Sequence, residues 1–275
     1  MCTGPSPFVR TYAALRSDGS SRRSVAAQTA SGDLRHVRRG IYATAGTCTP
    51  TLAAAAHGGA LTCESAARHL GLWVLDDPDR VHVRLHRGGH RYAHDGCRCI
   101  EHWDRGGATD AFGLPAVERI LVQILQCRGI EAMFVALESA LRKRMLPSHR
   151  RAALRTAVPA AVQPIVDFAR NDADSGLESL VRLRLRRHGL SVRTQVRVPG
   201  VGRIDLIIGE RLLIEVDGKA GHADATSRHK DLVRDAHAAM WDYDTLRFDY
   251  AMVVHDWDLV ERAILSRVAA GRHLR

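Results

Sequence analysis

Three carboxylates on two neighbouring β-forming segments are the residues of this 275-residue chain best suited to chemistry. Asp205 lies in the first segment, and Glu215 and Asp217 lie in the second. A three-residue turn at 209–211 would place Asp205 directly opposite Glu215. Like charges in that position destabilise a hairpin unless a cation neutralises them. Carboxylate oxygens suit Mg²⁺, with Mn²⁺ as a substitute, so the spacing predicts a divalent-cation site made by all three acids.

The elements that must position these acids are the two strands of a hairpin. Side chains alternate between the faces of a strand, which separates an aliphatic set from the set that contains the acids. We expect the aliphatic set to form the buried face: Ile204, Leu206, Ile208, Leu212, Ile214 and Val216. The alternative is the solvated face of an edge hairpin, although such faces usually mix charges of both signs.

Several residues of the C-terminal third follow one another in an informative order: Glu178, Asp205, the run 215–218, His222, Asp231, Arg234 and the segment 246–248. This order resembles the PD-(D/E)XK restriction-endonuclease-like fold, in its branch similar to very-short-patch-repair endonucleases. The resemblance covers about residues 172–268. It implies an α/β/α domain with a mixed sheet and metal-dependent hydrolysis of phosphodiester bonds in DNA.

The resemblance also implies roles for individual acids. Asp205 and Glu215 would ligate the metal, and Asp217 and Glu178 would support it. Asp217 stands two residues after the second acid, where the superfamily pattern has a lysine. Glu178 has a second interpretation as a capping-box residue, because it follows Ser175 by three positions.

The proton transfers would fall to Lys219 or His222, and the identity of the general base stays open between them. Arg234 would contact DNA from the following helix. Its alternative is an ion pair with Asp231, three residues earlier on the same helix.

Net charge favours a polyanionic partner. The chain carries a formal net charge of +10 and a pI of about 9.9, which suits duplex DNA. Most of its basic residues are arginine, a bias that a GC-rich genome also produces. No stretch approaches 18 uninterrupted apolar residues, and the N-terminus lacks an apolar signal core. We therefore expect a cytoplasmic protein with no membrane partner.

The N-terminal region has a separate organisation. Helices are expected at 7–15 and 21–30, followed by a basic ribbon at 34–42 that bends at Gly40. Residues 5–50 resemble the winged helix-turn-helix of AbiEi-type antitoxins. The resemblance implies DNA contacts through Arg22 and Arg23 of the second helix and through the ribbon residues Arg38 and Arg39. The alternative is a small helical domain that makes protein contacts.

The middle region carries no comparable catalytic motif. One group could in principle bind zinc: His90, His94, Cys97, Cys99 and His102. The segment 97–102 alternates like a strand and lacks the two-residue gap of a zinc knuckle, which favours a packing role. A polar, turn-forming stretch at 171–176 is typical of a linker.

The whole chain is thus expected to be a multi-domain α/β protein. We expect a winged helix-turn-helix domain at 1–50, an α+β scaffold at 51–168 and a nuclease domain at 172–275. The predicted function is a Mg²⁺-dependent DNA endonuclease, delivered to duplex DNA by the winged helix.

Both resemblances imply a setting in defence against phages or mobile elements, with a toxin or defence-system protein as a partner. A homodimer would supply the two active sites that a double-strand cut usually needs, although the oligomeric state stays open. The alternative function is a non-catalytic antitoxin or transcriptional regulator whose nuclease-like domain is degenerate.

Overall fold

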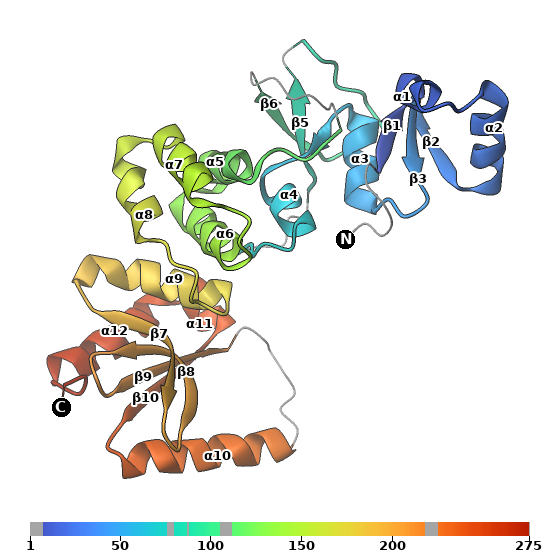
Figure 1. The fold of residues 1–275 in the computed structure, drawn as a ribbon. Helices are drawn as coiled ribbons and strands as arrows, with labels where there is room; N and C mark the ends of the chain where they lie inside the picture. The colour runs from blue at the N-terminus through green and yellow to red at the C-terminus, as the bar shows by residue number, and fades with distance from the viewer. Residues whose placement is uncertain (1–7, 76–79, 87, 105–111, 218–224, 275) are drawn as a thin grey trace. The chain divides into compact units, whose positions relative to one another are not determined.

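The structure is a computed structural model that describes residues 8–75, 80–86, 88–104, 112–217 and 225–274. For residues 104 and 225–231 it describes the backbone alone. The fold is mixed α/β and divides into two compact units (Figure 1). Unit 1 lies within residues 1–129 and 148–159, and unit 2 lies within 130–147 and 160–275.

Unit 1 begins with a three-stranded antiparallel sheet and two helices. The sheet has the order β1-β3-β2, and its elements are β1 (Val9–Thr11), α1 (Tyr12–Ser17), α2 (Arg22–Ser31), β2 (Leu34–Arg38) and β3 (Ile41–Thr44). Gly40 has φ of +74°, so the expected bend between the two ribbon strands is confirmed. The expected first helix is wrong at its start, because Val9–Thr11 pairs with β3. Thr11 then caps α1 by accepting a hydrogen bond from the Ala14 N–H over 3.0 Å.

The rest of unit 1 contains a second three-stranded sheet, of order β4-β5-β6, and four helices. Along the chain these elements are α3 (Thr49–His57), β4 (Ala60–Leu61), α4 (Cys63–His69), β5 (His82–His86), β6 (Ile100–Asp104), α5 (Val117–Arg128) and α7 (Ser148–Ala157). The strand expected to start at Cys97 begins only at Ile100. Cys97 and Cys99 therefore lie in the segment that leads into the sheet.

Unit 2 is a four-stranded mixed sheet with helices on both sides. The sheet has the order β10-β9-β8-β7, and β10 runs parallel to β9 while the other pairs are antiparallel. The strands are β7 (Val192–Val198), β8 (Gly202–Ile208), β9 (Leu212–Asp217) and β10 (Asp244–Asp249). The helices are α6 (Ile130–Arg142), α8 (Gln163–Phe168), α9 (Gly176–Leu185), α10 (Ala225–Met240), α11 (Tyr250–His255) and α12 (Trp257–Ala269), with short 3₁₀ turns at Ala160–Val162 and Arg186–His188. In Figure 1, α10 lies on one side of the sheet, and α9, α11 and α12 lie on the other.

Helix α6 belongs to unit 2 because it packs along α9. A buried ion pair joins Glu138 of α6 to Arg182 of α9, and both side chains are only 1% exposed. Arg182 also lies over the Phe168 ring, with 4.3 Å between its guanidinium carbon and the ring centre. The stretch expected to be a linker, at 171–176, therefore lies inside unit 2, and the expected three domains stay a prediction.

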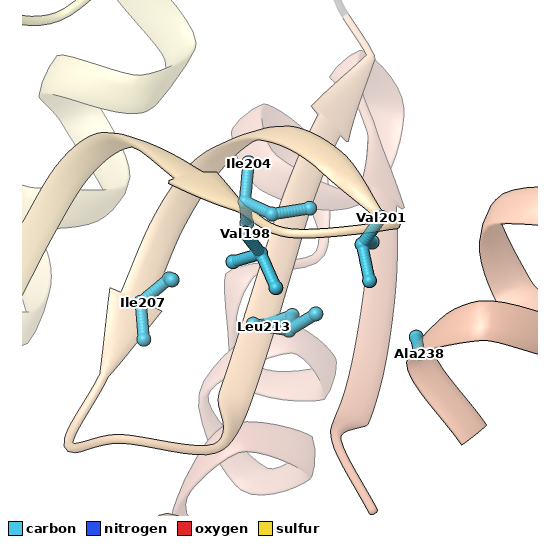
Figure 2. Packing of buried hydrophobic residues seen from close by; sticks show 6 residues of the cluster. All are labelled: Val198, Val201, Ile204, Ile207, Leu213 and Ala238. Atoms are coloured by element: carbon cyan, nitrogen blue, oxygen red, sulfur yellow. The ribbon is translucent and has the colours of Figure 1, made fainter. Parts of the chain in front are cut away.

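The hairpin of β8 and β9 has the predicted register. Ile208 pairs with Leu212 across a three-residue turn, and Leu206 pairs with Ile214. Burial, however, extends to both faces of the hairpin, since Ile207 and Leu213 are also fully covered. They pack with Ala238 of α10, and Ile204 joins the same cluster (Figure 2). The expectation of a single buried face was wrong, because α10 covers the aliphatic half of the face that carries the acids.

Candidate active site

The paired part of β8 and β9 ends beside the predicted acids. Leu206 and Ile214 are the last paired residues of the two strands, so Asp205 and Glu215 each lie one residue beyond the paired segment. The Asp205 carboxylate accepts a hydrogen bond from the Val216 N–H over 2.9 Å. The Asp205 side chain thus accepts the hydrogen bond of a β9 backbone N–H at the point where the backbone pairing of β8 and β9 ends. This bond holds the carboxylate of Asp205 against the next strand, on the side of Glu215.

Gln195 of β7 joins two of the acids. Its side-chain amide donates to Glu178 over 2.6 Å and to Asp205 over 3.2 Å. The amide oxygen of Gln195 accepts a hydrogen bond from Arg203, which turns the NH₂ group toward the two acids. Gln195 has φ of +54°, a backbone conformation that residues other than glycine, asparagine and aspartate seldom adopt. The sequence carries no motif that indicated this residue.

Glu178 lies in the first turn of α9 and is 2% exposed. Its N–H donates to the Ser175 hydroxyl over 3.2 Å, and its carboxylate accepts from the Asp174 N–H over 3.0 Å. Glu178 therefore caps its helix and also contacts the amide that reaches Asp205. Burial raises the pKa of Glu178 to about 7, and the charge of Asp205 adds to that rise, while the hydrogen bond from Gln195 opposes it.

Glu215 is paired with a cation from the opposite helix. Arg234 of α10 donates to its carboxylate over 2.6 Å and to the carbonyl oxygens of Val201 and Arg203 over 3.0 and 3.1 Å. Burial nevertheless raises the pKa of Glu215; Arg234 opposes this rise, and the charge of Asp205 adds to it. Arg234, predicted to contact DNA, thus lies among the acids.

Asp217 is exposed at the end of β9. In the parallel register it lies beside Asp249 of β10, whose carboxylate caps α11 by accepting from the Met252 N–H over 2.8 Å. We call Glu178, Asp205, Glu215 and Asp217 the acid cradle. Two further predicted residues, Lys219 and His222, lie outside the described residues, as does the side chain of Asp231.

The acid cradle has the composition that a hard divalent cation needs. Its ligand atoms are all carboxylate oxygens, the donors that Mg²⁺ and Mn²⁺ prefer. Burial is the main cause of the raised pKa values of Glu178 and Glu215, and the charge of Asp205 adds to both. Among the described residues, no three of these carboxylates bring ligand atoms within 4.8 Å of one another, so a divalent cation between Asp205 and Glu215 stays a prediction.

The arginines predicted to bind DNA from unit 1 divide into two groups. Arg22 and Arg39 line one concave surface together with Tyr12, His36 and Tyr42. Arg23 is exposed beside Arg22 in the first turn of α2. Arg38 points elsewhere: it donates to the Ala55 carbonyl over 3.1 Å, and its guanidinium lies 4.0 Å from the Tyr92 ring centre. Three of the four thus remain placed for a ligand outside the chain.

No family model matches the chain, and a search of curated proteins found no match. Among the described helices, none is both long enough and apolar enough to cross a lipid bilayer.

Proposed function

We propose that unit 2 is a metal-dependent endonuclease that hydrolyses phosphodiester bonds in duplex DNA. One observation carries the proposal: Glu178, Asp205 and Glu215 come from three separate elements, Gln195 joins Glu178 to Asp205, and the charge of Asp205 adds to the burial that raises the pKa of Glu178 and of Glu215. Like charges in such proximity reduce stability, so their gathering needs a counter-charge. A divalent cation supplies that charge and serves this reaction.

The residues of the acid cradle take distinct roles in this proposal. Asp205 and Glu215 hold Mg²⁺, or Mn²⁺ in its place, and Asp217 and Glu178 support them. The cation, when bound, lowers the pKa of a water ligand and offsets charge on the phosphate group. Gln195 keeps the carboxylate of Asp205 oriented through its amide. Lys219 or His222 handles the proton transfers, and the PD-(D/E)XK-like fold is part of the same proposal.

Unit 1 delivers DNA in this proposal. The hollow lined by Arg22 and Arg39 carries positive charge beside aromatic side chains, and the net charge of the chain is +10. Arginine binds phosphate oxygens through paired N–H groups. Together with the strands β2 and β3, this surface supports a winged-helix mode of binding, in which α2 enters the major groove.

A second candidate function is a DNA-binding regulator of the antitoxin class that does not cleave. The contact between Arg234 and Glu215 favours it, because an internal cation already occupies one of the two central acids. Asp217 at the position of the usual lysine favours it as well. This regulator binds DNA through unit 1 and keeps unit 2 as a folded remnant.

Cleavage of supercoiled plasmid by the full chain separates the two functions. The assay compares protein depleted of Mg²⁺ by gel filtration with the same protein after Mg²⁺ is added back. Nuclease activity is expected only with Mg²⁺, and Asp205→Asn and Glu215→Gln should each lower it at least about 100-fold. Glu210→Gln is the matched control, because Glu210 is exposed in the turn at the other end of the same hairpin.

Each result of this assay points to one conclusion. DNA retardation without cleavage by the wild-type protein supports the regulator. Cleavage that persists without Mg²⁺, or in both variants of the acid cradle, rejects the proposed active site.

A further inference from the structure

We propose that unit 1 binds Zn²⁺ through His57, His94, Cys97 and Cys99, a set that we call the His57 cluster. One ligand atom from each of these residues lies within 4.8 Å of the others. Two thiolates and two imidazoles form the ligand set of a closed, structural zinc site. This inference is independent of the proposed nuclease activity, which concerns unit 2.

Distances within the His57 cluster match a tetrahedral site. The Nδ1 atom of His57 lies 3.2 Å from the Sγ atom of Cys97, and the Nε2 atom of His94 lies 3.8 Å from the Sγ atom of Cys99. Zinc–sulfur and zinc–nitrogen bonds of ordinary length separate neighbouring tetrahedral ligands by roughly 3.3–3.8 Å. The rings of His57 and His94 are nearly perpendicular, at 85°, so both can point a nitrogen at one centre.

A carboxylate orients His57 from its other nitrogen. The Nε2 atom of His57 lies 3.2 Å from Glu101, whose second oxygen accepts from the Trp103 indole over 3.1 Å. A carboxylate behind a histidine fixes its tautomer and leaves Nδ1 as the lone-pair donor, a common arrangement at zinc sites.

The loop that carries three of the ligands is fixed to the end of α3. The Tyr92 N–H donates to the His57 carbonyl over 2.9 Å, and the Cys97 N–H donates to the His94 carbonyl over 3.1 Å. A Cβ atom at Gly58 would lie 2.5 Å from the backbone oxygen of His90, so only glycine permits this approach. The backbone therefore brings a distant histidine to the two cysteines.

Charge balance suits this cluster to a zinc ion. Cys97 and Cys99 are both partly buried, and their sulfur atoms belong to one group of ligand atoms. Zn²⁺ with two thiolates is electrically neutral overall, and neutral groups are far less costly to bury than isolated charges. With all four positions taken by side chains, the ion would have a structural role.

A second group of the same composition supports a second zinc site on separate observations. Cys63, His82, His102 and Cys127 form this His82 cluster, again with ligand atoms within 4.8 Å of one another. The Nδ1 atom of His82 lies 2.9 Å from the Nε2 atom of His102 and 3.9 Å from the Sγ atom of Cys127. Cys63 and His82 are buried, so part of this group lies inside unit 1.

Metal analysis of the full chain, produced in zinc-supplemented medium, tests both sites. We expect about two equivalents of zinc in the wild-type protein and about one in the Cys97→Ser/Cys99→Ser variant. The Cys63→Ala/Cys127→Ser variant should lose the other equivalent, so each variant is the control for the other. Cys48→Ser, outside both clusters, should retain about two. Unchanged zinc in the Cys97→Ser/Cys99→Ser protein, or a Cys97–Cys99 disulfide found by mass spectrometry, would overturn the His57 site.

X-ray absorption at the zinc edge tests the ligand set on the wild-type protein, so the result does not depend on whether a variant folds. Two sulfur and two nitrogen ligands are expected, with distances of about 2.3 Å and about 2.0–2.1 Å. Cobalt in place of zinc should give a thiolate charge-transfer band. A shell of oxygen and nitrogen alone, or wild-type protein without zinc, would reject the proposal. The plasmid assay depletes Mg²⁺ by gel filtration because a chelator would remove zinc as well.

Discussion

Arg234 donates a hydrogen bond to Glu215 over 2.6 Å and so ties helix α10 to strand β9 at the acid cradle. The same guanidinium also donates to the backbone carbonyls of Val201, just before β8, and of Arg203, within β8. A cation of the protein thus contacts one of the two carboxylates proposed to hold the metal. If a divalent cation binds there, it has to compete with Arg234 for Glu215.

Substitution of this arginine should make the protein more responsive to Mg²⁺. Arg234→Gln leaves Glu215 without its partner and should lower stability by about 1–3 kcal/mol when Mg²⁺ is absent. Added Mg²⁺ restores positive charge, so the rise in Tm on Mg²⁺ addition should be larger in the variant than in the wild type. Arg247→Gln, which removes a more weakly coupled arginine, should change the rise less. Equal rises in all three proteins would contradict a cation site at Glu215.

Glu178 should make stability depend on pH in the absence of Mg²⁺. Its pKa is about 7 in the folded chain and 4.5 ordinarily, so the folded state binds more protons between these values. Stability should therefore fall as pH rises from about 4.5 to about 7. Glu178→Gln removes this titration and should reduce the fall in the free energy of unfolding over that pH range by on the order of 3 kcal/mol. Urea unfolding at several pH values measures the effect, with Glu210→Gln as the control that keeps the wild-type slope.

The buried pair of Glu138 and Arg182 should show strong coupling. Arg182→Met leaves a buried carboxylate unpaired and should cost roughly 3–5 kcal/mol of stability. Adding Glu138→Gln removes that charge and keeps an acceptor for the Arg170 N–H, which donates to Glu138 over 2.5 Å. The double variant should therefore recover most of the loss. Losses that simply add would show that the two residues do not depend on each other.

Substitutions of the unit 1 arginines should affect either DNA affinity or stability, depending on which arginine is changed. Arg22→Ala and Arg23→Ala should each weaken DNA binding across sequences and reduce the slope of log K against log salt by about one. Arg38→Ala should lower Tm, because Arg38 contacts Ala55 and Tyr92 inside the unit. Fluorescence anisotropy at several salt concentrations checks the first effect. An unchanged slope in both variants would argue against α2 as the DNA contact.

The hairpin could be predicted from sequence because its signals are local. The length of the turn fixes which residues of the two strands face each other. Once Ile208 pairs with Leu212, Leu206 must pair with Ile214. The segment 246–248, named in the sequence for its place in the order of motifs, lies within β10. Burial of Ile207 and Leu213 was missed, since it depends on α10 covering the second face.

Contacts between distant segments had no local signal. Gln195 is a neutral residue in a strand, and only the folded sheet reveals that its amide meets two acids. Arg234 was predicted to contact DNA, with Asp231 as its alternative partner, but its guanidinium donates to Glu215, 19 residues earlier in the chain. In the same way, His57 lies 40 residues before Cys97, and the spacing of the cysteines alone gave no reason to join them.

The chain passes between its two units three times, because α6 belongs to unit 2 and the following α7 belongs to unit 1. No single cleavage of the polypeptide yields two intact halves. A fragment that starts at residue 172 lacks α6 and leaves Arg182 buried without Glu138. Such a fragment would be unstable, and proteolysis at a single point would disrupt one unit rather than release two folded ones.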